Sequence, residues 1–453
     1  MGLFDIFKKK DGDSHYLSAK EIREIAKANS KVMMALEKRK HRKCPESEFL
    51  TEMRSEENIL EIDDLHTYFF TEQGIVKAVN GVSIDIPKGS VVGVVGESGC
   101  GKSVTSMSVM QLLQGPTGQI YSGSIRFKSL DYKRDANGDP IPVYERDENG
   151  KIVYTQATDK KGNPLTDKEG KPVLIPKRKI NASGVYEFET EEKVYDIAKM
   201  PIHEMHRVRG REIAMIFQEP MTSLNPVFTI GDQLDEVIFV HTPGATAEMA
   251  KARSIEMLKL VGIAMPERVY NAYPHELSGG MRQRVMISMA LACDPRLIIA
   301  DEPTTALDVT IQAQILDLLR ELKDRIDGSI MLITHDLGII AEMADYVVVM
   351  YAGRVIEKGT VSEIFHSPMH PYTIGLQKSK PTMSSDTETL FNIPGNVPNP
   401  VNMPSHCFFK ERCSQCIEKC SGDYPCMIQV SPTHFVACHL YGDEGLKKGQ
   451  GEE

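Results

Sequence analysis

The pattern of apolar and polar positions changes several times along this chain of 453 residues. From Ile59, the segments "NILEIDDLHTYFF" and "VKAVNGVSIDI" alternate between apolar and polar side chains, which is typical of paired strands with one buried face. The run "SVVGVVG" is short, apolar and β-branched, which predicts a strand buried on both faces of a parallel sheet. A glycine-rich turn and an expected helix follow it.

The same pattern returns after residue 200. We expect strands at "REIAMIFQ", "RLIIADEP", "SIMLITH" and "YVVVMYAGRVIEKG", with helices between them at 231–262 and 309–326. Strands that alternate with helices indicate a parallel sheet covered by helices. The pattern therefore predicts an α/β domain over 57–360.

Residues 1–56 are expected to form a partly helical N-terminal extension. Ser18 and Glu21 match a capping box, and apolar residues follow at helical spacing before a basic cluster at 38–43. We expect this helix to lie on the surface, exposed to solvent. The basic cluster leaves open the alternatives that the segment contacts an anionic membrane face or a partner protein.

Residues 133–200 interrupt the α/β pattern. The turn motifs "DANGDP", "DENGK", "DKKGNP" and "DKEGKP" recur there, with short β-prone pieces between them. They predict a set of hairpins inserted into the domain. Because the segment is polar and rich in lysine, a disordered linker is the alternative.

The composition is that of an ordinary globular protein. The chain is 41% hydrophobic and 26% charged, with a net charge of −10, and this mild acidity argues against nucleic acid as the main partner. No window approaches the roughly 20 apolar residues that a membrane span needs. The first residues do not match a secretory signal. We therefore expect a cytosolic protein, in which disulfides are disfavoured.

The segment "GESGCGKS", from Gly96 to Ser103, matches the phosphate-binding pattern GxxxxGKS between an expected strand and an expected helix. In such a loop, backbone amides surround the phosphates, Lys102 reaches the β- and γ-phosphates, and the Ser103 hydroxyl binds Mg²⁺. The residues expected to contact ATP here are Gly96, Ser98, Gly99, Gly101, Lys102, Ser103 and Val104.

Cys100 lies within this loop, next to Lys102. Its thiolate could be stabilised there and be reactive, or the cysteine could simply occupy a permissive position.

The segment "LIIADEP" predicts a second half of the site. An apolar strand brings Asp301 to Mg²⁺ and places Glu302 where it can polarise the attacking water. Two adjacent carboxylates at the end of a buried strand need a cation nearby.

At this point the chain resembles the ABC-type ATPases. The segment "LSGGMRQR" (277–284) is similar to their signature loop. Other positions follow in the family's order: Gln218 in "IFQEP" resembles the Q-loop glutamine, Asp308 in "ALD" the D-loop, and His335 in "LITHD" the switch histidine. Phe69 or Tyr68 is similar to the aromatic residue that stacks on adenine, and Phe69 is the preferred candidate.

The resemblance implies an architecture and a mechanism. The fold would be a P-loop NTPase with a RecA-like core, an antiparallel β subdomain and a helical signature subdomain. Two such domains would face head to tail, so that Ser278, Gly279 and Gly280 of one bind the γ-phosphate held by the other. The implied catalytic residues are Glu302, His335 and Gln218, and the implied Mg²⁺ ligands are Ser103, Gln218 and Asp301.

Further segments resemble the ATPase subunits of oligopeptide and dipeptide importers. These are "MIFQEPMTSLNP", "HPYT" (370–373) and the cysteine-bearing tail within 361–453. The resemblance implies a second ATPase subunit (a paralogue or a second copy), two membrane permease subunits and, indirectly, a solute-binding protein. It places the chain peripherally at the cytoplasmic face of the cell membrane. The alternatives are a soluble ABC ATPase of DNA repair or chromosome maintenance and an iron–sulfur redox sensor.

Six of the nine cysteines lie in the tail, five of them in "CFFKERCSQCIEKCSGDYPC". Reduced thiols, a zinc site with Cys413-x2-Cys416 and His439, and an iron–sulfur cluster are all compatible with this spacing. In relatives of the importer subunits, four matching cysteines are associated with a 4Fe–4S cluster, and the resemblance extends that expectation to Cys407, Cys413, Cys420 and Cys438. Cys416 and Cys426 are extra to the pattern.

Overall fold

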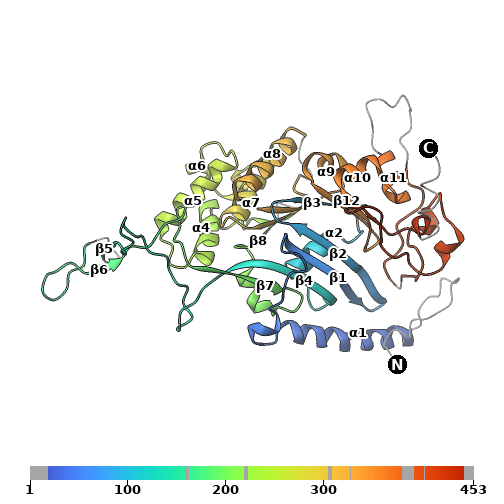
Figure 1. Cartoon of the computed structure of the whole chain (residues 1–453), viewed down its shortest axis with the longest axis horizontal. Helices are drawn as coiled ribbons and strands as arrows, with labels where there is room; N and C mark the ends of the chain where they lie inside the picture. The colour runs from blue at the N-terminus through green and yellow to red at the C-terminus, as the bar shows by residue number, and fades with distance from the viewer. Residues whose placement is uncertain are drawn as a thin grey trace.

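The computed structural model of the chain describes residues 19–158, 163–218, 223–304, 309–326, 328–379, 392–401 and 403–442. Over these ranges the chain forms a body of two sheets with helices on both sides (Figure 1). A long hairpin arm projects from one end of the body, and the C-terminal residues pack at the other end. No helix in these ranges has both the length and the apolar character needed to cross a membrane.

The central sheet has eight strands in the order β13-β14-β12-β11-β3-β10-β9-β8. The strands β11, β3, β10, β9 and β8 pair in parallel, and every residue of β3, β8, β9 and β10 is buried. The expectation of short apolar strands buried on both faces is confirmed. These central strands are β3 (Val91–Val95), β8 (Ile213–Ile216), β9 (Leu297–Asp301), β10 (Ser329–Ile333), β11 (Tyr346–Tyr351) and β12 (Arg354–Thr360).

The second sheet has four antiparallel strands in the order β2-β1-β4-β7. Their alternating pattern gives each strand one buried face, as predicted. The strands are β1 (Asn58–Thr71), β2 (Gly74–Pro87), β4 (Gly118–Tyr132) and β7 (Thr190–Asp196). The short helix α2 (Lys102–Val109) contacts β1 and β2 of this sheet and β9 of the central sheet.

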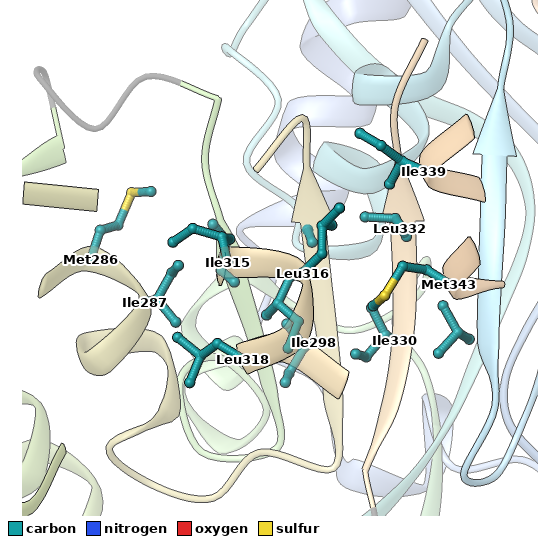
Figure 2. Packing of buried hydrophobic residues seen from close by; sticks show 14 of the residues in the cluster. Met286, Ile287, Ile298, Ile315, Leu316, Leu318, Ile330, Leu332, Ile339 and Met343 are labelled. Carbon is teal, nitrogen blue, oxygen red and sulfur yellow. The ribbon is translucent and has the colours of Figure 1, made fainter. Parts of the chain in front are cut away.

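Helices complete the core on the other side of the central sheet. Figure 2 shows apolar side chains of α8 and α9, among them Leu316 and Met343, beside Ile298 of β9 and Ile330 of β10, while Ile287 of α7 lies next to α8. The longer helices begin at capping residues, for example α4 at Thr229 and α7 at Ser278. The helices are α4 (Ile230–His241), α5 (Ala247–Leu260), α6 (Pro266–Tyr270), α7 (Gly279–Leu291), α8 (Val309–Ile326), α9 (Leu337–Met343), α10 (Val361–His366) and α11 (Pro371–Lys378).

The N-terminal helix α1 (Ala19–Lys40) lies along the antiparallel sheet (Figure 1). Its apolar residues Val32, Met33 and Leu36 pack on Tyr68, Phe70 and Ile75. The Asn29 amide is buried and donates a 2.8 Å hydrogen bond to the Thr71 carbonyl oxygen. The expected helix is present, but one face of it is docked on the sheet instead of being solvated. Ser18 of the predicted capping box lies outside the described residues.

The described part of the insert forms hairpins, which is the arrangement that its turn motifs predict. In four successive loops an aspartate or asparagine side chain accepts hydrogen bonds from the amides two and four residues further on; these residues are Asp135, Asp147, Asp167 and Asn181. The arm includes the short strands β5 (Tyr154–Gln156) and β6 (Leu174–Pro176). Strand β7 is the edge of the antiparallel sheet, so the insert proper spans 133–189 and not 133–200.

The C-terminal residues are built onto the central sheet. Strands β13 (Ile428–Gln429) and β14 (Phe435–Val436) extend it beyond β12, where Glu357 is paired with Val436. The Glu357 carboxylate is fully buried and accepts hydrogen bonds from the Met369 and His370 amides, and it also contacts His434 Nε2 at 2.8 Å. The predicted domain boundary at residue 360 coincides with the end of β12. It therefore separates two parts of the chain, 57–360 and 361–453, that contribute strands to the same sheet.

His370 is a buried histidine at the start of α11. Its Nδ1 accepts a 3.0 Å hydrogen bond from the Tyr372 amide. Burial lowers the pKa of His370 to about 4, although the nearby Glu357 charge opposes that shift. The ring is therefore neutral in the folded chain and can be charged only at the cost of desolvation.

We predict that His370 makes the protein acid-sensitive. As the pH falls from about 6.5 toward 4, the unfolded chain binds a proton that the folded chain does not, so stability is lost in that window. Between pH 7 and pH 5 the free energy of unfolding of the wild type should fall by roughly 2 kcal/mol more than that of a His370→Asn variant, in which the asparagine keeps a hydrogen-bond acceptor at the helix cap. Urea unfolding at both pH values measures this. His366→Asn, at an exposed histidine one helix earlier, is the control. Equal pH dependence of wild type and His370→Asn would contradict the prediction.

Candidate nucleotide site

The candidate site lies at one edge of the central sheet. β3 leads into the glycine-rich loop, β9 ends at Asp301, and Gln218 and His335 closely follow β8 and β10. These four strands are parallel neighbours, so their carboxyl ends meet at the same edge. Ligands of open α/β sheets bind at this edge.

The glycine-rich loop needs glycine at two positions for steric reasons. Gly96 has a φ of 153° and Gly101 a φ of 100°, which other residues rarely adopt. A Cβ atom on Gly96 would lie 2.2 Å from the Met350 carbonyl oxygen, and one on Gly101 would lie 2.3 Å from that of Ala78. Gly99 also has a positive φ, of 78°, but a Cβ there would meet no atom within 4 Å. The loop is therefore wedged between two backbone segments of the domain.

Two side chains at the start of α2 are positioned for phosphate and metal. The Lys102 ammonium is buried and donates to the carbonyl oxygens of Gly96, at 2.7 Å, and Glu97, at 3.1 Å. The Ser103 hydroxyl donates a 3.0 Å hydrogen bond to Asp301 Oδ1. Burial raises the pKa of Asp301, and the Ser103 hydrogen bond opposes this shift. Oxygen ligands of this kind suit Mg²⁺, so the pair fits the expected metal.

The remaining loop residues differ in exposure. Ser98 and Gly99 are exposed, whereas the Val104 side chain is partly buried and packs against the core. The structure thus leaves the middle of the loop open to solvent, next to the N-terminus of α2.

Two of the three predicted catalytic residues, Gln218 and His335, contact the third, Glu302. Gln218 Nε2 donates a 2.9 Å hydrogen bond to Glu302 Oε2, and His335 Nδ1 lies 3.4 Å from Glu302 Oε1. Glu302 has a φ of 47°, a left-handed conformation that costs a non-glycine residue free energy, and its amide donates to the Ile333 carbonyl oxygen. The sheet edge therefore brings together a carboxylate, an amide and an imidazole from three different strands.

The predicted signature loop presents the N-terminus of α7. Ser278 caps this helix by accepting a hydrogen bond from the Met281 amide, and Ser278 and Gly279 are exposed. Gly280 lies in the first turn of the helix. Exposed amides at a helix N-terminus attract anions, which fits the predicted contact with a phosphate of another subunit.

The structure favours Phe69 over Tyr68 as the adenine-stacking residue. Tyr68 is buried, stacks on Tyr121 with centroids 5.0 Å apart, and packs toward α1. Phe69 is half-buried and points to the other face of β1, as does Thr67. Thr67 in turn contacts Ser108 of α2 at 2.8 Å, so this face is the one beside the glycine-rich loop and its helix.

Two predicted residues need separate comment. Asp308 lies outside the described residues. Cys100 is 1% exposed, and burial raises the pKa of its thiol even though Lys102 Nζ lies 3.9 Å from the sulfur. Of the two alternatives for Cys100, burial therefore favours a cysteine that simply occupies a permissive position over a stabilised, reactive thiolate, because the buried sulfur is desolvated.

Two residues from the C-terminal region, Arg412 and Tyr372, also hold the glycine-rich loop through Glu97. Arg412 makes a bidentate ion pair with Glu97, with Nη1–Oε2 at 2.7 Å and Nη2–Oε1 at 2.9 Å. The Glu97 amide donates a 2.8 Å hydrogen bond to the Tyr372 hydroxyl oxygen. The segment "HPYT" contains Tyr372, but nothing in the sequence indicates that it reaches the loop. Arg412 lies 315 residues from Glu97 and carries no motif signal at all.

The tail cysteines do not form a metal site in the part of the chain that is described. Those residues contain no group of three or more histidine, cysteine or acidic side chains arranged to hold a metal ion. Burial raises the pKa of Cys407 to about 11 and that of Cys438 to about 12, with smaller contributions from neighbouring thiols of the same set. Cys416 and Cys426 are exposed. The iron–sulfur and zinc predictions find no support in this geometry.

Family models match two parts of the chain. The ABC transporter model matches residues 79–161 and 174–305, and the model of the oligopeptide/dipeptide transporter C-terminal region matches residues 356–420. The gap in the first match falls within the hairpin insert.

Curated proteins of Bacillus subtilis (strain 168) are similar over most of their length. "Oligopeptide transport ATP-binding protein OppD" is 44% identical over 86% of this chain and 90% of its own, and "Oligopeptide transport ATP-binding protein AppD" is 41% identical over 86% and 99%. "Dipeptide transport ATP-binding protein DppD" is 41% identical over 85% of this chain and 95% of its own.

We predict that two glycines of the loop respond differently to alanine. Gly101→Ala places a methyl group against the Ala78 carbonyl oxygen and should destabilise the fold by more than about 3 kcal/mol. In Gly99→Ala the new methyl group meets no other atom, so the variant should lose only about 1 kcal/mol of stability, from the left-handed conformation of the alanine. Urea unfolding of both variants measures the difference. Equal losses would show that the close approach of Ala78 does not constrain the loop.

Proposed function

Because this chain belongs to the family of ATP-binding subunits of oligopeptide and dipeptide ABC transporters, we propose that it hydrolyses ATP to power peptide import through partner permeases. The observation that carries the proposal is its 41–44% identity to such subunits over nearly their whole length, which includes the C-terminal region as well as the ATPase domain. ATP hydrolysis is the activity of this family's ABC domain.

The chemistry that we assign to the site follows from its contacts. The loop from Gly96 to Ser103 binds the phosphates through its amides and Lys102. Glu302 takes the proton of the attacking water or orients it, and His335 and Gln218 place that carboxylate. Ser103, Asp301 and Gln218 would hold Mg²⁺, which when bound neutralises charge on the β- and γ-phosphates. Phe69 would stack on adenine.

A second subunit would complete the site. Ser278, Gly279 and Gly280 lie at an exposed helix N-terminus, while the chain's own phosphates would be held by its own loop. We therefore assign these residues to the γ-phosphate bound by a partner ATPase subunit, either a second copy or a paralogue. The loss of that phosphate on hydrolysis would remove the shared anion and let the two subunits separate.

Exposed apolar residues at the two ends of α4 support docking to membrane permeases. Val227 and Phe228 precede α4, and Phe239 and Val240 lie in its last turn; their exposed fractions are 74%, 52%, 45% and 66%. Large exposed apolar side chains in one region of a protein indicate a contact with another protein. We propose that this region holds the chain at the cytoplasmic face of the membrane, against two permeases that receive solute from a solute-binding protein.

The alternative functions have less support. A DNA-repair or chromosome ATPase is disfavoured by the acidic net charge and by the transport proteins that the chain resembles. The described part of the insert consists of hairpins, whereas such ATPases carry long coiled coils at that position. A redox sensor would not need Gln218 and His335 both in contact with Glu302.

We predict that Glu302→Gln separates ATP binding from hydrolysis. Glutamine keeps the hydrogen bond to Gln218 but cannot accept a proton, so the hydrolysis rate should fall about 100-fold or more while MgATP still binds. ATPase assays and peptide uptake into proteoliposomes with the partner permeases measure this. Glu321→Gln, at an exposed position on α8, is the matched control. ATPase activity stimulated by DNA, without peptide uptake, would refute the transport function.

For the tail, the 4Fe–4S cluster on Cys407, Cys413, Cys420 and Cys438 remains a separate proposal. It is carried over from the resemblance of the tail to importer subunits, with zinc as the alternative metal, and the geometry of the described residues adds no support. Anaerobic purification with metal analysis and a visible spectrum tests it. Bound iron together with the visible absorption of an iron–sulfur cluster would support the proposal. A colourless, zinc-loaded protein would show that the metal is zinc. A folded protein without metal would exclude both metals.

A further inference from the structure

Glu97, at the beginning of the glycine-rich loop, is held at three of its groups. Its amide donates to the Tyr372 hydroxyl oxygen, its carboxylate is paired with Arg412, and its carbonyl oxygen accepts from Lys102. Two of these three contacts come from the C-terminal region, from α11 and from the segment that carries the cysteines. Ser98 and Gly99, which follow Glu97 directly, are the exposed residues of the loop.

Arg412 is itself fixed by its surroundings. It is 8% exposed, its Nε donates to the Pro394 carbonyl oxygen at 2.9 Å, and its Nη1 donates to the Tyr351 hydroxyl at 3.3 Å. The ring of Phe409 lies 5.9 Å from the guanidinium and also packs on the rings of Tyr351 and Tyr372. A bidentate, largely desolvated ion pair with these supports has little freedom to shift.

We propose that the C-terminal region positions the glycine-rich loop for ATP, with Arg412 and Tyr372 as positioning residues that act through Glu97. The inference rests on the proposed ATP site and deepens it. Arg412 and Tyr372 make no contact with the phosphates themselves. Tyr372 fixes the peptide plane before Glu97, and Arg412 fixes the Glu97 side chain. Together they hold Glu97 in place, and so the direction of the amides that follow and the carbonyl oxygen that accepts from Lys102.

The position of the C-terminal region supports this role. Strand β14 pairs with β12, and Ser431 and Thr433 donate to the Glu363 carboxylate, so the region is attached to the ATPase domain at a second place away from the loop. Burial tends to raise the pKa of Glu363, but these hydrogen bonds and those from Thr360 lower it to about 2. Variants at this second attachment can therefore separate the effect of Arg412 from general docking of the region.

The test compares MgATP affinity and steady-state ATPase kinetics of the full chain. In Arg412→Met and in Tyr372→Phe we expect KM for ATP to rise about five- to tenfold while kcat stays within about twofold, because the loop is misplaced before ATP binds but the catalytic residues are intact. The double variant Glu97→Gln, Arg412→Met should show no larger rise in KM for ATP than Arg412→Met alone, because both changes remove the same ion pair.

The controls separate positioning from folding. Glu411→Gln changes an exposed neighbour of Arg412, and Thr433→Val removes a contact of the second attachment; both should keep the wild-type KM. Thermal unfolding of each variant shows whether it folds. If Arg412→Met does not fold, the KM of Tyr372→Phe tests the inference, because that change removes a single oxygen atom.

Three results would overturn the inference: a wild-type KM in folded Arg412→Met and Tyr372→Phe, additive losses in the double variant, or an equal rise of KM in Thr433→Val. If the wild-type chain itself did not bind MgATP, the proposed function would fail instead.

Discussion

The structure depends on the parallel pairing of β3, β10, β9 and β8. Parallel strands share the direction of their carboxyl ends, so the loops that follow them meet at one edge, however far apart they are in the chain. This pairing places Ser103 against Asp301, across 198 residues, and Gln218 against Glu302, across 84. The middle of each strand is apolar because it is buried on both faces, and polar residues such as Asp301 of β9 and Ser329 of β10 appear only at the strand ends.

The same edge concentrates unfavourable conformations and charges. Gly96 and Gly101 have positive φ angles in close contact with neighbouring backbone, and Glu302 has one without being glycine. Asp301 is buried enough that its pKa is raised, with Glu302 adjacent. Such strain and desolvation persist only when the surrounding core enforces them. The apolar contacts of α8 and α9 with β9 and β10 provide that enforcement (Figure 2).

The C-terminal region is part of the ATPase body and not a separate appendage. It adds β14 to the central sheet, buries Glu357 against His434, and reaches the glycine-rich loop through Arg412 and Tyr372. The hairpin arm is different, because it leaves the body and is stabilised locally by asparagine and aspartate turns (Figure 1). Both segments are additions to a common core, and among the residues that the structure describes, those of the C-terminal segment contact the site.

The sequence by itself determined the central strands, the glycine-rich loop, and the identities of Lys102, Ser103, Asp301 and Glu302, because these features depend on local patterns of apolar runs and on motifs of fixed spacing. Hairpins in the insert were also predictable, since each turn is closed by residues within five positions of one another. Only the tertiary structure decided which face of α1 is buried, that Tyr68 faces that helix while Phe69 faces α2, and that Cys100 is too desolvated to ionise readily. It also revealed Arg412 beside Glu97. The reason is physical: burial and ion pairing between distant segments depend on how the sheets stack, and no local pattern encodes the distance between residues 315 positions apart.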